Sequence, residues 1–158
     1  MKTLCLYYSR TNTTRVIAKR IAMQLDADMF EYTDGKDRKG LKGYLTSAID
    51  AYKEPPEVRI VGDEPCWEDY DKVIVAMPVW CEMPCVIGKG FLQQFSSRFC
   101  GDIYLVVTHM AATDYEKAIL KTYNVSNVKP KAHLSLQTKN HDPDSEIKSF
   151  VRSISPNE

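Results

Sequence analysis

Apolar residues follow two patterns along this chain, and the two patterns alternate. Short runs rich in β-branched and aromatic residues are typical of buried strands, and stretches with apolar side chains every three or four positions are typical of amphipathic helices. The predicted strands span residues 4–8, 28–33, 72–76, 103–108 and 132–137, and the predicted helices span residues 15–25, 41–52, 85–95, 114–123 and 144–154. Such alternation predicts an α/β fold, with a parallel sheet and helices on both of its faces.

The segments between these elements are rich in polar and turn residues. Residues 34–40 form a polar, glycine-containing stretch, Pro55 and Pro56 end the second helix, residues 58–61 form a short extended piece, and residues 63–71 form an acidic loop. Two helices have a clear apolar face. In the first it consists of Val16, Ile17, Ile21, Ala22 and Leu25, and in the third of Ile87, Phe91, Leu92 and Phe95.

Composition narrows the class of protein. The chain has 158 residues, of which 44% are hydrophobic and 27% charged, and this predicts a single domain over residues 1–158. Basic and acidic residues both number 21, so bulk charge indicates neither a nucleic-acid nor a membrane partner. The first residues lack the apolar segment of a secretion signal, and we expect a cytoplasmic protein. Five cysteines without a C-x-x-C pair favour reduced thiols, and three dispersed histidines predict no metal site.

Four hydroxyl side chains gather where the first strand ends and the first helix begins. Ser9, Thr11, Thr13 and Thr14 lie within six residues, next to a helix whose first backbone N–H groups have no partner inside the helix. Hydroxyls, amides and the positive end of the helix dipole can together hold a phosphate. The same residue types are the preferred N-caps of ordinary helices, so capping alone is the alternative interpretation.

Two further loops are expected at the same edge of the sheet. The loops after the first, third and fourth strands lie at the carboxyl edge, where parallel sheets bind ligands. Residues 78–84 present Trp80 between two prolines as an exposed, flat aromatic suited to stacking on a planar ligand, with a buried core tryptophan as the alternative. Residues 108–113 form the third loop. A phosphate site at one end and an aromatic ring at the other predict a mononucleotide ligand.

The chain resembles a flavodoxin of the short kind over nearly its whole length. Residues 8–14 match the family's S/T-x-T-G-x-T phosphate loop, residues 71–80 match its Y/F-D-x-hydrophobic-P-x-W segment, and residues 43–47 are similar to a stretch in some bacterial members. The resemblance implies a flavodoxin-like three-layer sandwich, with a five-stranded parallel sheet in the order 2-1-3-4-5 and helices on both faces. It also implies FMN as the cofactor.

Matched position by position, the resemblance assigns the FMN contacts to three segments. The phosphate would be held by hydroxyls and backbone amides of Ser9, Arg10, Thr11, Asn12, Thr13 and Thr14. One face of the isoalloxazine would be covered by Trp80, next to Pro78, Val79, Cys81 and Glu82. The pyrimidine edge would meet Thr108, His109, Met110 and Ala111, with Tyr115 as a candidate second aromatic.

Each of the three segments also departs from the family pattern. Asn12 stands where the family has glycine, and asparagine tolerates the left-handed backbone of such a turn. Cys81 and Glu82 stand where relatives have a glycine whose peptide flips toward reduced flavin. A non-glycine residue makes that flip costlier by about 1 kcal/mol, which predicts weak stabilisation of one-electron-reduced flavin. His109 replaces a glycine-rich stretch and either acts on the flavin as a donor or proton-transfer group or has no role.

Three functions are compatible with these residues. An electron carrier would pass electrons between redox partner proteins, and carriers of this kind dock through an acidic face. The acidic cluster here, residues 63, 64, 68, 69 and 71, precedes the third strand and is expected at the edge opposite the flavin. An FMN-dependent reductase would take hydride from a nicotinamide and reduce a quinone, a nitro compound or a similar small-molecule acceptor. A protein that keeps the fold with weak or lost FMN binding is the third option. We favour FMN-dependent electron transfer.

Overall fold

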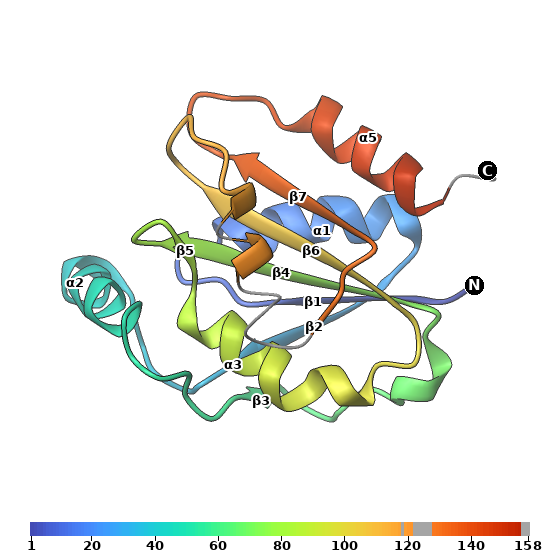
Figure 1. Ribbon diagram of the computed structural model, residues 1–158, viewed down its shortest axis with the longest axis horizontal. Coiled ribbons are helices and arrows are strands. Elements are labelled where there is room, and N and C mark those ends of the chain that lie inside the picture. The colour runs from blue at the N-terminus through green and yellow to red at the C-terminus, as the bar shows by residue number, and fades with distance from the viewer. Residues whose placement is uncertain (118, 122–127, 156–158) are drawn as a thin grey trace.

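The computed structural model describes residues 1–117, 119–121 and 128–155 (Figure 1). Its sheet contains five parallel strands in the order β2-β1-β4-β6-β7, which is the predicted order 2-1-3-4-5. These strands are β1 (Thr3–Tyr7), β2 (Asp28–Thr33), β4 (Lys72–Trp80), β6 (Asp102–His109) and β7 (Ala132–Gln137). Two short strands run antiparallel at its margins, β3 (Arg59–Ile60) beside β2 and β5 (Met83–Pro84) beside β4. The predicted α/β class is confirmed.

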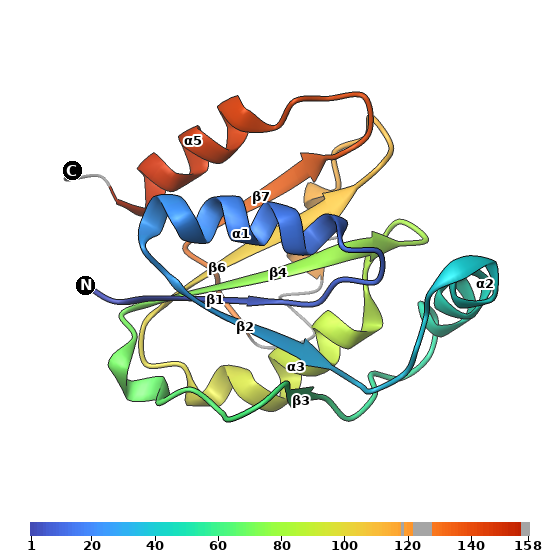
Figure 2. The ribbon, with the colours of Figure 1, turned by 180° about the vertical axis from the view of Figure 1, so that it is seen from behind.

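Helices cover both faces of the sheet, which gives the three predicted layers (Figures 1 and 2). On one face, α1 (Thr13–Leu25) and α5 (Asp144–Ile154) bury strand residues such as Ile74 and Val106. On the other face, α3 (Val86–Phe95) packs against the intervening residues, such as Val75 and Leu105. Successive side chains of a strand point to opposite faces, so a strand covered on both sides is apolar throughout.

The helices follow their predicted faces with one exception. Ile87, Phe91, Leu92 and Phe95 of α3 are buried, as predicted. Val16 of α1, however, is 50% exposed, so its prediction as a core residue is wrong. The buried stripe of α1 runs one position further along the helix and consists of Thr14, Ile17, Ala18, Ile21 and Ala22.

The remaining helical segments are short. Two 3₁₀ helices, η1 (Trp67–Asp69) and η2 (Ser96–Arg98), flank the amino ends of β4 and β6, and Trp67 is buried in the core. The helix predicted at 114–123 lies partly outside the described residues, and residues 116–117 and 119–121 of it are helical. Among the described helices, none combines the length and apolar character needed to cross a membrane.

The prediction of a loop at residues 78–84 is wrong. β4 continues four residues beyond its predicted end, through Trp80, and then turns back into β5, so that Val79 pairs with Pro84. Only Cys81 and Glu82 form the turn, and both have a positive φ, of 48° and 64°. A two-residue turn of this kind matches the twist of the two strands that it joins. Pro84 fits because a short edge strand tolerates a residue that cannot donate a hydrogen bond.

Helix α2 (Gly40–Asp50) stands apart from the two helical layers. Both views place it beyond the carboxyl ends of the strands, rather than over a face of the sheet (Figures 1 and 2). Its buried residues are small or polar, namely Gly43, Ser47 and Asp50. A side chain at position 43 would collide with the backbone of Arg38, so glycine allows the helix to lie against that segment.

A buried cation holds α2 in this position. The guanidinium of Arg38 donates to both carboxylate oxygens of Asp34 at 2.7 Å and to Asp50, in the last turn of α2, at 3.0 Å. The side chains of Arg38 and Asp34 are each 1% exposed. The same guanidinium lies 5.5 Å from the ring centre of Trp80. A planar guanidinium suits this combination of paired hydrogen bonds and stacking on an aromatic ring. Arg38 therefore links α2 to the end of β4.

Candidate functional site

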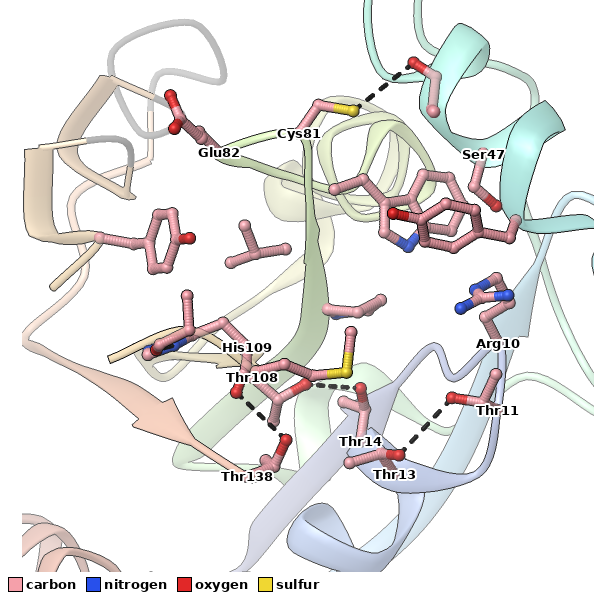
Figure 3. A pocket seen from close by; sticks show the side chains of 18 residues that line it. Arg10, Thr11, Thr13, Thr14, Ser47, Cys81, Glu82, Thr108, His109 and Thr138 are labelled. Carbon is pink, nitrogen blue, oxygen red and sulfur yellow. Dashed lines mark hydrogen bonds between the residues drawn. The ribbon is translucent and has the colours of Figure 1, made fainter. Parts of the chain in front are cut away.

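The three predicted segments meet in one pocket at the carboxyl edge of the sheet. The pocket encloses about 340 Å³, a volume typical of small-molecule sites. Figure 3 shows Thr11, Thr13 and Thr14 on one side of it and Cys81 and Glu82 on the opposite side. The predicted residues that line the pocket are Arg10, Thr11, Thr13, Thr14, Pro78, Val79, Trp80, Cys81, Glu82, Thr108, His109, Met110, Ala111 and Tyr115. Ser9 and Asn12 belong to the same β1–α1 loop without lining the pocket.

The β1–α1 loop leaves hydrogen-bonding groups without a protein partner. Asn12 occupies the N-cap position of α1 with φ of 70°, which is the left-handed backbone expected for the residue that replaces glycine. Its side chain makes no capping hydrogen bond, and the first turn of α1 contains no acidic residue. The buried Ser9 Oγ also has no hydrogen-bond partner among the residues that the structure describes. Amides at a helix start and a buried hydroxyl without partners are groups that a phosphate would satisfy.

The threonines of this segment differ in their roles. Thr14 is buried, and its Oγ1 lies 2.8 Å from the Oγ1 of Thr108, so this pair connects the start of α1 to β6. Thr11 and Thr13 are exposed, and their hydroxyls lie 3.5 Å apart at the pocket (Figure 3). Thr14 and Thr108 therefore fix the spacing of the two segments, and Thr11 and Thr13 present their hydroxyls to the pocket.

Trp80 forms part of the pocket wall from a buried position. The prediction of an exposed, loop-borne Trp80 is wrong, because the residue ends β4 and is only 7% exposed. Tyr8 meets its ring edge-on at a centre distance of 5.8 Å, and Arg38 lies over it. Since Trp80 still lines the pocket, its stacking on a planar ligand stays a prediction.

Four residues of the pocket were not predicted from the sequence. Tyr44, Ser47 and Ala48 come from α2, and Thr138 follows β7. Tyr44 is 53% exposed, and the guanidinium of Arg10 lies 5.5 Å from its ring centre, so these two side chains join the β1–α1 loop to α2. The segment 43–47 stands out in the sequence by its resemblance to flavodoxins, but nothing in the sequence places α2 beside the pocket.

The turn between β4 and β5 carries backbone strain at the pocket rim. Cys81 and Glu82 both adopt the left-handed region, which costs a non-glycine residue about 1 kcal/mol. The Sγ of Cys81 lies 3.8 Å from the carbonyl oxygen of Ala48. Cys85 caps α3 beneath the turn, and burial raises the pKa of its thiol to about 12. Cys85 is therefore an unreactive thiol at neutral pH.

His109 uses both ring nitrogens within the protein. Its Nδ1 lies 2.8 Å from the carbonyl oxygen of Ala111, which can only accept, so Nδ1 carries a proton. Its Nε2 lies 2.9 Å from the hydroxyl oxygen of Ser135. That oxygen accepts a hydrogen bond from the backbone N–H of Tyr115 at 3.3 Å. The rings of His109 and Tyr115 are 4.7 Å apart. Burial lowers the pKa of His109, and the neutral ring accepts from Ser135. This geometry suits a residue that holds the loop 110–115 in place.

No protein-family model and no curated protein matches the sequence. Solved structures, however, match the fold over nearly the whole chain. A flavoprotein from Lactobacillus acidophilus NCFM, in complex with FMN, is 24% identical and covers 94% of this chain and 97% of its own, with a TM-score of 0.69. A flavodoxin from the domain Archaea is 10% identical and covers 99% and 97%, with a TM-score of 0.59. A WrbA-like flavodoxin from Agrobacterium tumefaciens is 11% identical and covers 98% and 95%, with a TM-score of 0.58. This chain therefore has the flavodoxin fold.

The buried position of His109 predicts a pH-dependent stability. Its pKa in the folded state lies below the value of 6.5 for a free side chain, so the unfolded chain takes up a proton first as the pH falls. The contribution of His109 to the free energy of unfolding is fully present above pH 6.5. It is lost as the pH falls from there toward the pKa of the folded state. We expect the unfolding free energy, measured by urea denaturation between about pH 8 and pH 5, to fall more steeply for the wild type than for His109→Gln. His133 and His141 remain in both proteins as an internal control, and equal slopes would contradict the prediction.

Proposed function

We propose that this protein binds FMN at the carboxyl edge of its sheet and acts as an electron-transfer flavoprotein. The observation that carries the proposal is the pairing of an anion site with an aromatic pocket wall. The anion site consists of the first turn of α1, the free hydroxyl of Ser9 and the exposed Thr11 and Thr13. The flavoprotein of Lactobacillus acidophilus, which shares the fold, is a complex with FMN, and this supports the choice of ligand.

The residues present suit FMN in both of its parts. Thr11, Thr13 and the amides at the start of α1 would bind the phosphate, with Arg10 as a nearby cation. The segment 108–111 and Trp80 would flank the ring system, and Tyr44 would close the pocket from α2. When bound, FMN supplies reversible electron transfer, and the protein positions the ring and limits its exposure to water.

The charges at the pocket favour a small acceptor as a second candidate function. Among the described residues that line the pocket, Arg10 is the basic side chain of the lysine and arginine type, and Glu82 is the acidic side chain. None of the acidic cluster at 63, 64, 68, 69 and 71 lines the pocket. A carrier that docks by charge needs a field of one sign around its flavin, whereas the described lining residues contribute one charge of each sign. The reduction of a quinone or nitro compound at the expense of NADH or NADPH is therefore the second candidate.

Removal of the two exposed hydroxyls tests the FMN site. Wild-type protein should turn yellow with FMN and quench its fluorescence on titration. Thr11→Ala combined with Thr13→Ala should weaken binding by about 1–3 kcal/mol for each hydroxyl, because each loses a hydrogen bond to a charged phosphate. Thr46→Ala is the matched control, since this threonine hydrogen-bonds to Lys42 within α2 and does not line the pocket. A wild-type protein that does not bind FMN would refute the proposal, and an unchanged affinity of the double variant would refute the phosphate role.

Anaerobic mixing with a nicotinamide separates the two candidate functions. If the protein is a reductase, NADH or NADPH should bleach the bound flavin within seconds, and addition of a quinone should restore the colour. If it is a carrier, bleaching should require a separate reductase. The measurement is stopped-flow absorbance of the flavin, with the same nicotinamide mixed with free FMN as the control.

A further inference from the structure

Helix α2 presents a stripe of apolar side chains to the outside of the molecule. Leu41, Leu45, Ile49 and Tyr52 are exposed by 78%, 55%, 62% and 79%. Their spacing of four, four and three residues places them along one side of the helix and of the turn that follows it. We call these four residues the outer stripe. Tyr44 of α2 is also exposed but lines the pocket, and other exposed large apolar residues, such as Met23 on α1 and Val61 after β3, lie on other elements. Single apolar residues are normal on a protein surface.

The outer stripe lies opposite the buried side of the helix. With about 100° of rotation per residue, Gly43, Ser47 and Asp50 point away from Leu45. The amphipathic pattern of α2 is thus inverted, because its small and polar side is buried and its large apolar side is exposed. Folding of the described residues leaves this surface uncovered, and a contiguous exposed apolar surface is typical of an interaction site.

We infer that the outer stripe binds the outer stripe of a second copy of this chain, with the two α2 helices antiparallel about a two-fold axis. Rows of side chains at a spacing of four residues interdigitate in the commonest class of helix packing. A two-fold axis brings the same surface of each copy together, so one stripe supplies both halves of the contact. A tyrosine such as Tyr52 buries about 150–250 Å² when covered. The two stripes therefore supply the apolar centre of an interface of standard size, which buries about 800 Å² on each partner.

The charges near the helix ends match this arrangement. Antiparallel packing places the amino end of α2, with Lys39, next to the carboxyl end of the other α2, where Glu54 follows. Both side chains are exposed, and neither has an ion pair within the described part of the chain. The opposed helix dipoles add to the attraction between these ends. Basic and acidic residues both number 21, so two copies carry no net charge that would separate them.

The contact would also stabilise one wall of the pocket. Tyr44 and Ala48 lie on the flank of α2 between its buried side and the outer stripe, and both line the pocket. α2 is held to the rest of the chain mainly by its small polar side and by Arg38. A second copy on its outer side would fix the helix from the opposite direction.

Sedimentation velocity at micromolar to submillimolar protein concentration tests the inference. The wild type should sediment as a dimer, at twice the chain mass of 18.0 kDa. Leu45→Glu should raise the dimer dissociation constant at least about 100-fold, because position 45 lies near the middle of the stripe and the two carboxylates would meet near the axis. Met23→Glu is the matched control, an apolar position on α1 that is more exposed than Leu45, and should remain a dimer. Circular dichroism checks that each variant is folded.

A mixture of variants gives the sharpest form of the test. Leu45→Glu and Leu45→Lys should each be monomeric alone and should form a heterodimer when mixed, since the opposite charges then meet at the axis. A monomeric wild type would overturn the inference, and its co-sedimentation with phosphatidylcholine vesicles would then assign the stripe to a lipid surface. A Leu45→Glu variant that stays dimeric would also overturn it, because the dimer would use another surface.

Discussion

The start of α1 imposes the constraint on which the pocket depends. The first backbone N–H groups of a helix have no acceptor within it. Here the N-cap side chain of Asn12 does not supply one, and the first turn contains no carboxylate. The loop therefore has an open site for an anion at the edge of the sheet where the other pocket segments also end. The buried pair of Thr14 and Thr108 holds two of those segments at a fixed spacing around it.

A second constraint acts on the opposite wall of the pocket. Arg38 is buried, and two carboxylates from different segments neutralise its charge while its planar group covers Trp80. One buried cation thus sets the place of α2 and supports the aromatic wall at the same time. Removal of one partner would leave a buried charge without compensation, which proteins tolerate poorly. The network explains how a helix with a small polar inner side stays attached while its apolar side faces outward.

Local patterns in the sequence predicted most of the fold. Continuous apolar runs identified β1, β4 and β6, which are covered on both faces. The strands β2 and β7 are only partly buried and were identified by their place in the alternation of strands and helices. The resemblance to flavodoxins predicted the order of these strands in the sheet. The hairpin at Trp80 was missed because Pro78 and Pro84 are typical of loops. In the structure Pro84 pairs with Val79 across the hairpin, and Pro78 pairs with Thr108 of β6. Val16 was misplaced because a helical period fixes a stripe only to within one neighbouring position.

The candidate site was predicted where chain order determines it. The carboxyl ends of strands β1, β4 and β6 come together at one edge by topology alone, so Thr11, Trp80 and His109 share a pocket. Tyr44 and Ser47 were missed because the position of α2 depends on the buried contacts of Arg38, which are distant pairings without a local signal. The two partners of the His109 ring depend on Ser135 in another strand, and no spacing in the sequence reveals them.

The affinity for FMN compared with that for riboflavin tests the central claim most directly. Riboflavin has the same ring system and lacks only the phosphate. If the start of α1 is the anion site, FMN should bind at least about 100-fold more tightly, because two or more hydrogen bonds to a charged group contribute about 1.5–3 kcal/mol each. Equal affinities for the two flavins, measured by fluorescence titration under the same conditions, would contradict the claim that this loop anchors the ligand.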